Sequence, residues 1–123
     1  RIEPPARDAV RSLIALGRLG AVVCANDRPA GTLMPALLAL GMSVPRDVRL
    51  AGIDDVEYAS LLPVPLTTLR QPTRQIGDAA MTAMVERVAR PDLPPRDVLL
   101  HCELVVRESC GARGVSASSV RES

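Results

Sequence analysis

The stretch AVVCANDRPAG, Ala21–Gly31, is the most informative part of the chain. A run of small apolar residues stops abruptly at Asn26 and Asp27, and a helical pattern begins directly after them. A short continuous apolar run is typical of a parallel strand that is covered on both faces. We therefore expect a buried strand over Ala21–Ala25, followed by a helix that ends near Leu40.

The same transition recurs in VRLAGIDDVEYAS, where the apolar run Val48–Ile53 ends on Asp54 and Asp55. In an open α/β sheet, ligands bind beyond the carboxyl ends of the strands. If the two strands are neighbours, Asn26 and Asp54 share one crevice. An amide donates and accepts hydrogen bonds and a carboxylate accepts several, which suits a ligand rich in hydroxyl or amino groups. The pattern predicts a site for a sugar, a polyol or a nucleoside.

Structural roles explain these polar residues as well. Asp27 has the side chain and position of a helix N-cap, and that role is favoured for it over ligand contact. Asn26 is equally compatible with both roles. Asp54 directly follows its strand and has the best geometry for facing the crevice, whereas Asp55 is expected to cap the short helical turn after it.

The rest of the chain alternates helices and strands. Helical spacing predicts one helix over Ala6–Leu16 and another over Thr73–Ala89. A short extended segment is expected within PVPLTTLRQP, residues 63–72, and a last strand over Val98–Val106. This order argues for an α/β fold in which a mainly parallel sheet is flanked by helices.

Composition limits the class of protein. The chain has 123 residues, 47% hydrophobic and 24% charged, which suits one modest globular domain, and its net charge of +1 indicates neither a nucleic-acid partner nor a membrane partner. Tyr58 is the single aromatic residue, so the core must be aliphatic. No apolar run approaches the ~18 residues that a membrane span needs. The cysteines, Cys24, Cys102 and Cys110, have no ligand-like spacing, which favours a reducing, cytoplasmic setting without a metal cofactor.

The sequence offers little for catalysis. The pair Asp54 and Asp55 has the chemistry of an acid and a base, but no nucleophile elbow, phosphate-binding glycine loop or metal-ligand spacing accompanies it. The only histidine, His101, falls inside the expected last strand, where a structural role is favoured. We therefore expect a binding protein and not an enzyme.

Several short motifs, in their order and spacing, resemble the lactose-repressor (LacI/GalR) family of transcription regulators. The motifs are VCANDRPAG, VPRDV, GIDD, PLTTLRQP and ELVVRES, and the similar region extends from about Ala6 to Ser109. The resemblance implies a partial periplasmic-binding-protein-like fold of type I, with two lobes around an effector cleft. It makes residues 1–109 the C-terminal part of the effector domain and residues 110–123 a disordered tail, with the helix-turn-helix and most of the first lobe absent.

The resemblance also assigns roles to particular residues. The expected effector-binding residues are Asn26, Asp27, Asp54, Gln71 and Thr73, and Ile76 occupies a position that often lines the effector site. A homodimer interface is expected at Met34, Leu38, Leu61 and Leu62, and core packing is the alternative for each. The helix from Thr73 would belong to the other lobe, and the strand from Val98 would return from it.

The implied function is the effector-binding and dimerisation portion of a DNA-binding transcriptional regulator that responds to a sugar or nucleoside-like molecule. Operator DNA would be bound through the missing N-terminal domain, and no membrane is involved. The sugar-binding protein of a transport system shares the fold and is the alternative. The sequence departs from the pattern of the family in two respects. Pro35 falls in mid-helix, where proline costs ~3 kcal/mol. Tyr58 is the single aromatic residue that could stack on a sugar.

Overall fold

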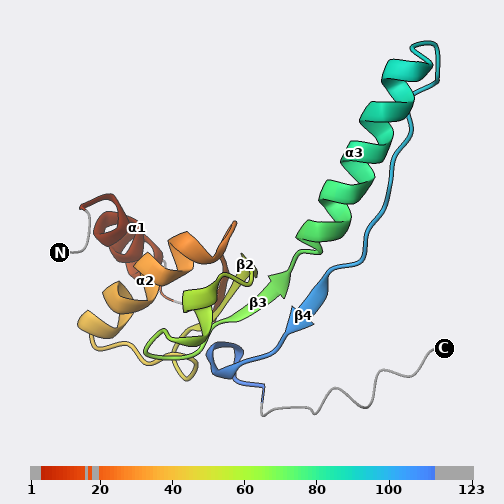
Figure 1. The fold of residues 1–123 in the computed structure, drawn as a ribbon. Coiled ribbons are helices and arrows are strands. Elements are labelled where there is room, and N and C mark those ends of the chain that lie inside the picture. The colour runs from red at the N-terminus through yellow and green to blue at the C-terminus, as the bar shows by residue number, and fades with distance from the viewer. Residues whose placement is uncertain (1–3, 16, 18–19, 113–123) are drawn as a thin grey trace. The chain divides into compact units, whose positions relative to one another are not determined.

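The computed structural model describes residues 4–15, 17 and 20–112, and the chain forms two units (Figure 1). The first unit comprises the chain up to Arg70 together with the chain from Leu104, and the second comprises Gln71–Glu103. Most of the expected tail, residues 113–123, lies outside the described residues. Each unit is considered in turn.

Helices and strands alternate along the described chain. In chain order they are α1 (Pro4–Ala15), β1 (Ala21–Val23), α2 (Asp27–Ala39), β2 (Arg49–Asp54), the 3-10 turn η1 (Glu57–Ser60), β3 (Thr67–Arg70), α3 (Thr73–Ala89), β4 (Glu103–Val105) and the 3-10 turn η2 (Glu108–Cys110). The expected helix Thr73–Ala89 is confirmed at both ends. The expected strand Val98–Val106 was too long, because residues 98–102 belong to the second unit, where no other strand is available for pairing. His101 therefore lies outside a strand and is exposed.

The sheet has the order β1-β2-β3-β4. β1 pairs with β2, and β2 with β3, both in parallel, with Val23 opposite Ala51 and Asp54 opposite Arg70. β4 lies next to β3 and runs in the opposite direction (Figure 1). A mainly parallel sheet flanked by helices is confirmed, and the carboxyl ends of β1, β2 and β3 lie at one edge of it.

The core of the first unit lies where α2 packs against β2 and α1. The largest fully buried apolar side chains are Val10, Met34, Leu37, Val48, Leu50 and Leu66. Each such side chain contributes roughly 1.5–3 kcal/mol through burial. The core is aliphatic as the composition requires, since Tyr58 remains exposed.

Helix α2 continues through Pro35 and ends at Ala39, with Leu40 as its C-cap. A proline in this position removes one backbone hydrogen bond and costs ~3 kcal/mol. On either side of Pro35 in sequence, Met34 and Leu37 are fully buried. Their burial outweighs the cost of the proline, so the helix stays intact through Pro35.

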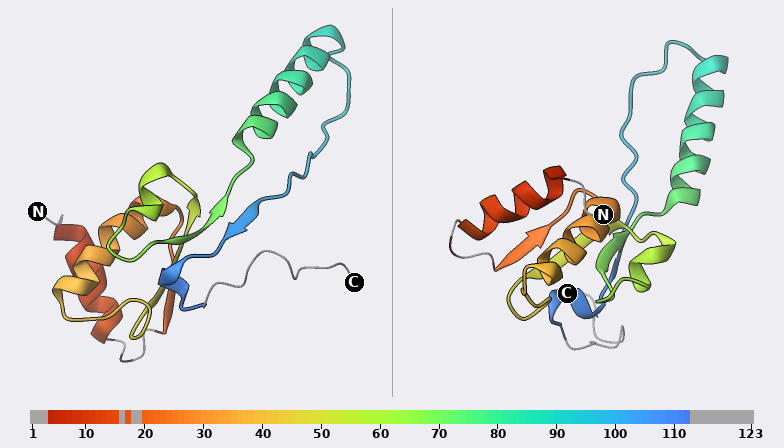
Figure 2. Two further views of the ribbon diagram at one scale, coloured as in Figure 1. Left: turned by 60° about the horizontal axis from the view of Figure 1, so that its bottom comes forward. Right: turned by 90° about the vertical axis from the view of Figure 1, so that its left-hand side faces the viewer.

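The second unit is a long helix followed by an extended return segment (Figure 2). None of the residues of α3 is buried. Its exposed large apolar side chains are Ile76, Met81, Met84, Val85 and Val88. This unit therefore has no buried core of its own. Neither α3 nor any other helix in the described part of the chain has the length and apolar character needed to cross a bilayer.

Candidate functional site

The carboxyl ends of β1 and β2 bring Asn26 and Asp54 to the same edge of the sheet. Val23 pairs with Ala51, and the backbone N–H of Cys24 donates to the Ala51 carbonyl at 2.8 Å. Asn26 and Asp54 each follow their member of this pair by three positions. The two polar residues therefore leave adjacent parallel strands at equivalent points, as the sequence predicted for neighbouring strands.

Asn26, and not Asp27, is the N-cap of α2, so the expected assignment of the cap to Asp27 was wrong. Asn26 has extended backbone angles, and its Oδ1 accepts a hydrogen bond of 3.1 Å from the N–H of Arg28. An Asx side chain in this position satisfies one of the free N–H groups of the first helical turn. The side chain is only partly buried, and within the described chain its amide nitrogen donates to no other group.

Asp27 is fully buried and has hydrogen-bond partners for both carboxylate oxygens. Oδ1 accepts from the hydroxyl of Thr68 at 2.6 Å, and Oδ2 accepts from the N–H of Val56 at 3.0 Å. The carboxylate lies directly against Gly52 of β2, because a Cβ at that position would be 2.1 Å from Oδ1. Asp27 thus links the start of α2 to β3 and to the loop that follows β2.

Asp54 and Asp55 both have positive φ angles, 117° and 56°. Positive φ is uncommon for residues other than glycine, and each such residue costs on the order of 1–3 kcal/mol. The conformation persists only where surrounding contacts fix it, and it occurs often at functional sites. Here the N–H of Asp55 donates to the hydroxyl of Thr68 at 3.3 Å.

Asp55 does not cap the turn that follows it, so that expectation was also wrong. The N-cap of η1 is Val56, and no side chain caps that turn. Instead, Asp55 Oδ2 pairs with the guanidinium of Arg70 at 2.6 and 2.7 Å, and Oδ1 pairs with that of Arg107 at 2.7 Å. Burial alone would raise the pKa of Asp55, but the hydrogen bonds and charges of Arg107 and Arg70 outweigh it and hold the pKa below its usual value.

Three residues of this network were missed from the sequence: Thr68, Arg70 and Arg107. All three lie in the motifs PLTTLRQP and ELVVRES. The available signal was a polar side chain inside each short extended segment, where a buried strand normally carries an apolar residue. Partner assignment needed the register, since Asp55 and Arg107 are separated by 52 positions.

The other expected effector residues lie at the start of the second unit. Gln71 is partly buried, and its backbone carbonyl accepts from the N–H of Thr73 at 2.9 Å. Thr73 is the exposed first residue of α3, and Ile76 is exposed one turn later. The sheet thus brings Asn26 and Asp54 together, and the second unit groups Gln71 with Thr73.

The four residues expected at a dimer interface differ in exposure. Met34 is fully buried in the core of the first unit. Leu38 and Leu62 are partly buried and pack against that core. Leu61 is 78% exposed in η1's C-cap position.

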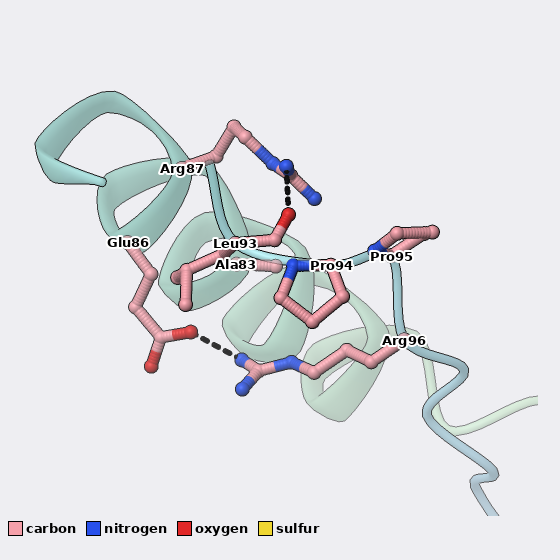
Figure 3. A pocket seen from close by; sticks show the side chains of 7 residues that line it. All are labelled: Ala83, Glu86, Arg87, Leu93, Pro94, Pro95 and Arg96. Atoms are coloured by element: carbon pink, nitrogen blue, oxygen red, sulfur yellow. Dashed lines mark hydrogen bonds and ion pairs between the residues drawn. The ribbon is translucent and has the colours of Figure 1, made fainter. Parts of the chain in front are cut away.

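The second unit has a hollow of about 340 Å³ near the C-terminal end of α3 (Figure 3). Arg96 pairs there with Glu86, and Arg87 donates to the backbone carbonyl of Leu93. These polar groups satisfy one another and close the turn after the helix, and no expected effector residue lines the hollow. No cluster of three or more metal-ligating side chains occurs in the part of the chain that the structure describes.

Comparison with known proteins defines the family. The periplasmic binding protein-like domain family matches residues 3–110. The HTH-type transcriptional repressor PurR of Vibrio vulnificus (strain CMCP6) is 39% identical over 89 residues, 72% of this chain and 27% of that protein. The ribose operon repressor of Escherichia coli (strain K12) is 35% identical over 103 residues, 83% of this chain and 31% of the repressor.

A solved structure agrees with this result. A transcriptional regulator of the LacI family from Sanguibacter keddieii DSM 10542 is 34% identical with a TM-score of 0.76, over 86% of this chain and 41% of that one. The chain spans 27% and 31% of the length of the two curated relatives. These relatives are repressors and regulators, so the transport alternative is not favoured. The chain belongs to the periplasmic binding protein-like domain family, in the form found in LacI/GalR effector domains.

Proposed function

We propose that this chain is the effector-binding portion of a LacI-type transcriptional regulator that responds to a sugar or nucleoside-like molecule. The observation that carries the proposal is the arrival of an amide and a carboxylate, Asn26 and Asp54, at one edge of two adjacent parallel strands. Hydrogen bonds from ligand hydroxyls to a charged group contribute roughly 1.5–3 kcal/mol each. Gln71 and Thr73 are proposed as further effector contacts.

Asp27 has a different role in this proposal. Its carboxylate is enclosed, and both oxygens are bonded to Thr68 and Val56. An effector hydroxyl would have to displace one of these partners. We therefore assign Asp27 to the support of the site. Asn26 and Asp54 stay the proposed effector contacts because they follow the paired ends of β1 and β2.

The proposed mechanism is a population shift in the whole protein. An effector that binds one arrangement of the effector domain more tightly favours that arrangement. A coupling of ~1–3 kcal/mol between effector and operator binding is sufficient for regulation. Operator DNA would be bound through a helix-turn-helix domain of the whole protein, which would act as a cytoplasmic homodimer.

The test is effector binding by the full-length protein. Thermal shift and calorimetry with D-ribose, sucrose and adenosine cover a pentose, a disaccharide and a nucleoside. We expect at least one of them to raise the Tm, and we expect Asp54→Asn to weaken its affinity at least tenfold.

Asn26 needs a variant that separates capping from binding. Asn26→Ser keeps an N-cap side chain but removes the amide, so it should retain stability and still lose affinity at least tenfold. Asp97→Asn, a change at an exposed site in the second unit, is the matched control and should bind as wild type. Unchanged affinity in both Asp54→Asn and Asn26→Ser would overturn the proposed site.

A further inference from the structure

One carboxylate, that of Asp55, receives two guanidinium groups from distant parts of the chain. Its side chain is 6% exposed, with Arg70 on one oxygen and Arg107 on the other. Arg70 is the last residue of the first unit before the chain enters the second, and Arg107 follows the return of the chain at Leu104. Both oxygens of the Asp55 carboxylate are thus paired with a guanidinium.

The segment around Asp55 has an unfavourable backbone that is fixed from several sides. Asp54 and Asp55 have φ angles of 117° and 56°. The N–H of Asp55 donates to Thr68, and the N–H of Val56 donates to Asp27. Such a conformation persists only where surrounding contacts determine it, and the two ion pairs of Asp55 are among these contacts.

Several hydrogen bonds fix the position of Arg107, and its guanidinium in turn fixes the position of the Asp55 carboxylate. A second nitrogen of its guanidinium donates to the carbonyl of Leu66 at 2.8 Å, and its backbone N–H donates to the hydroxyl of Thr67 at 2.8 Å. The Thr67 hydroxyl in turn donates to the Arg107 carbonyl at 3.0 Å. The position of Asp55 is thereby tied to the beginning of β3.

We propose that Asp55, held by Arg70 and Arg107, is a positioning residue that fixes the backbone of Asp54 and so aims the Asp54 carboxylate at the effector. This inference rests on the proposed function of Asp54. It adds that effector affinity depends on a carboxylate that does not touch the effector. Without the two ion pairs, the Asp54–Asp55 segment relaxes toward negative φ and the Asp54 side chain turns away.

The first test needs no effector. Crystal structures of the full-length protein and of its Asp55→Asn variant report the φ of Asp54 directly. We expect Asp54 to leave the positive-φ region in Asp55→Asn and to keep it in the control Asp97→Asn. An Asp54 with unchanged φ and side-chain direction in Asp55→Asn would overturn the proposal.

A milder variant covers the case in which Asp55→Asn does not fold. Arg70→Gln removes a guanidinium whose side chain is 49% exposed and leaves Arg107 on the carboxylate. We expect the Asp54 segment in this variant to show elevated B-factors or two conformers, in contrast to the control. A segment as well ordered as in wild type would count against the proposal.

The second test is a double-mutant cycle on effector affinity, with D-ribose as the first probe and sucrose and adenosine as the others. Asp54→Asn and Asp55→Asn should each weaken binding at least tenfold, and the double variant should bind no more weakly than Asp54→Asn alone. Losses that multiply in the double variant would show a merely structural role for Asp55 and overturn the proposal. Failure of the wild-type protein to bind any probe would count against the proposed function, and the effector-free structures would still decide the role of Asp55.

Discussion

The buried carboxylate of Asp27 shows how a charge is kept inside an aliphatic core. A buried ionised group without partners is very costly, yet Asp27 has a donor for each oxygen, in Thr68 and Val56. It also lies in the first turn of α2, where the helix dipole favours negative charge. The same carboxylate joins three segments, so its contacts stabilise the edge of the sheet where the proposed effector site lies.

The close approach of Asp27 to Gly52 gives a prediction about stability. Gly52→Ala would place a Cβ 2.1 Å from Asp27 Oδ1 and 3.1 Å from Leu66 Cδ2, so the carboxylate must move away from its donors. We expect the free energy of unfolding to fall by about 1–3 kcal/mol, measured by urea denaturation of the full-length protein.

The control for Gly52 is another glycine with open space around it. Gly77 lies in α3, and a Cβ there meets no atom within 4 Å. Gly77→Ala should be neutral or raise stability by up to ~1 kcal/mol through helix propensity. An equal response of the two variants would contradict the steric explanation.

Cys24 gives a prediction about pH. Burial raises the pKa of its thiol above the usual 9.0, and the negative charge of Asp27 raises it further. The folded state therefore keeps the proton more tightly than the unfolded chain, so stability is unaffected below about pH 8 and falls as the pH rises above 9. Mass spectrometry should find alkylation by iodoacetamide at pH 8 much slower at Cys24 than at the exposed Cys102. Equal rates at the two cysteines would contradict this.

At the scale of elements, the turn η2 closes the first unit through one hydroxyl. Ser109 is fully buried, accepts from the N–H of Thr67 at 2.8 Å and donates to the carbonyl of Leu50 at 2.6 Å. Its own N–H donates to the carbonyl of Pro65 at 3.0 Å. This short turn therefore joins the beginnings of the neighbouring strands β2 and β3.

Removal of that hydroxyl should be costly. Ser109→Ala leaves a buried donor and a buried acceptor unpaired, and we expect a loss of about 1–3 kcal/mol in the free energy of unfolding. Ser60→Ala removes an exposed hydroxyl that donates to the carbonyl of Glu57, and it should change stability by less than ~0.5 kcal/mol. Differential scanning calorimetry of both variants tests the difference, and similar Tm values would contradict it.

Elements with a strong local pattern could be predicted from the sequence, and those fixed by distant partners could not. The helix Thr73–Ala89 was predicted at both ends because its period and the preceding proline are local signals. The strand expected from Val98 is short because pairing requires a neighbour, and β3 is a neighbour only from Glu103 onward. Asp55 was wrongly predicted to cap the turn η1 for the same reason, because the arginines that pair with it are distant in sequence.

The candidate site was predictable in outline. The apolar runs that end at Asn26 and Asp54 predicted two parallel strands, and a shared edge if these strands are neighbours. The pairing of β1 with β2 meets that condition. It was not predictable that Asn26, and not Asp27, caps α2, since both are good cap residues and only the burial of one side chain separates them. The positive φ of Asp54 carries no sequence signal, because glycine does not occupy the position.

At the scale of the whole molecule, Leu61 is the main exposed residue of the proposed dimer interface. It is 78% exposed, whereas Leu62 and Leu38 are partly buried and pack against the core. We expect Leu61→Asp to shift the full-length protein from dimer to monomer in sedimentation velocity, because a charge buried in an interface is costly.

A second exposed leucine provides the comparison. Leu99 is 92% exposed and belongs to the second unit. Leu99→Asp should leave the sedimentation coefficient of the dimer unchanged. If Leu61→Asp also remains dimeric, the interface lies elsewhere.

The path of the chain between the two units has a consequence for how this domain tolerates change. The polypeptide departs along β3 and comes back along the adjacent, oppositely directed β4, with Gln71–Glu103 inserted between them. No residue of that insert takes part in the pairing of β1 with β2 or of β2 with β3, so a change in its length leaves this backbone pairing intact.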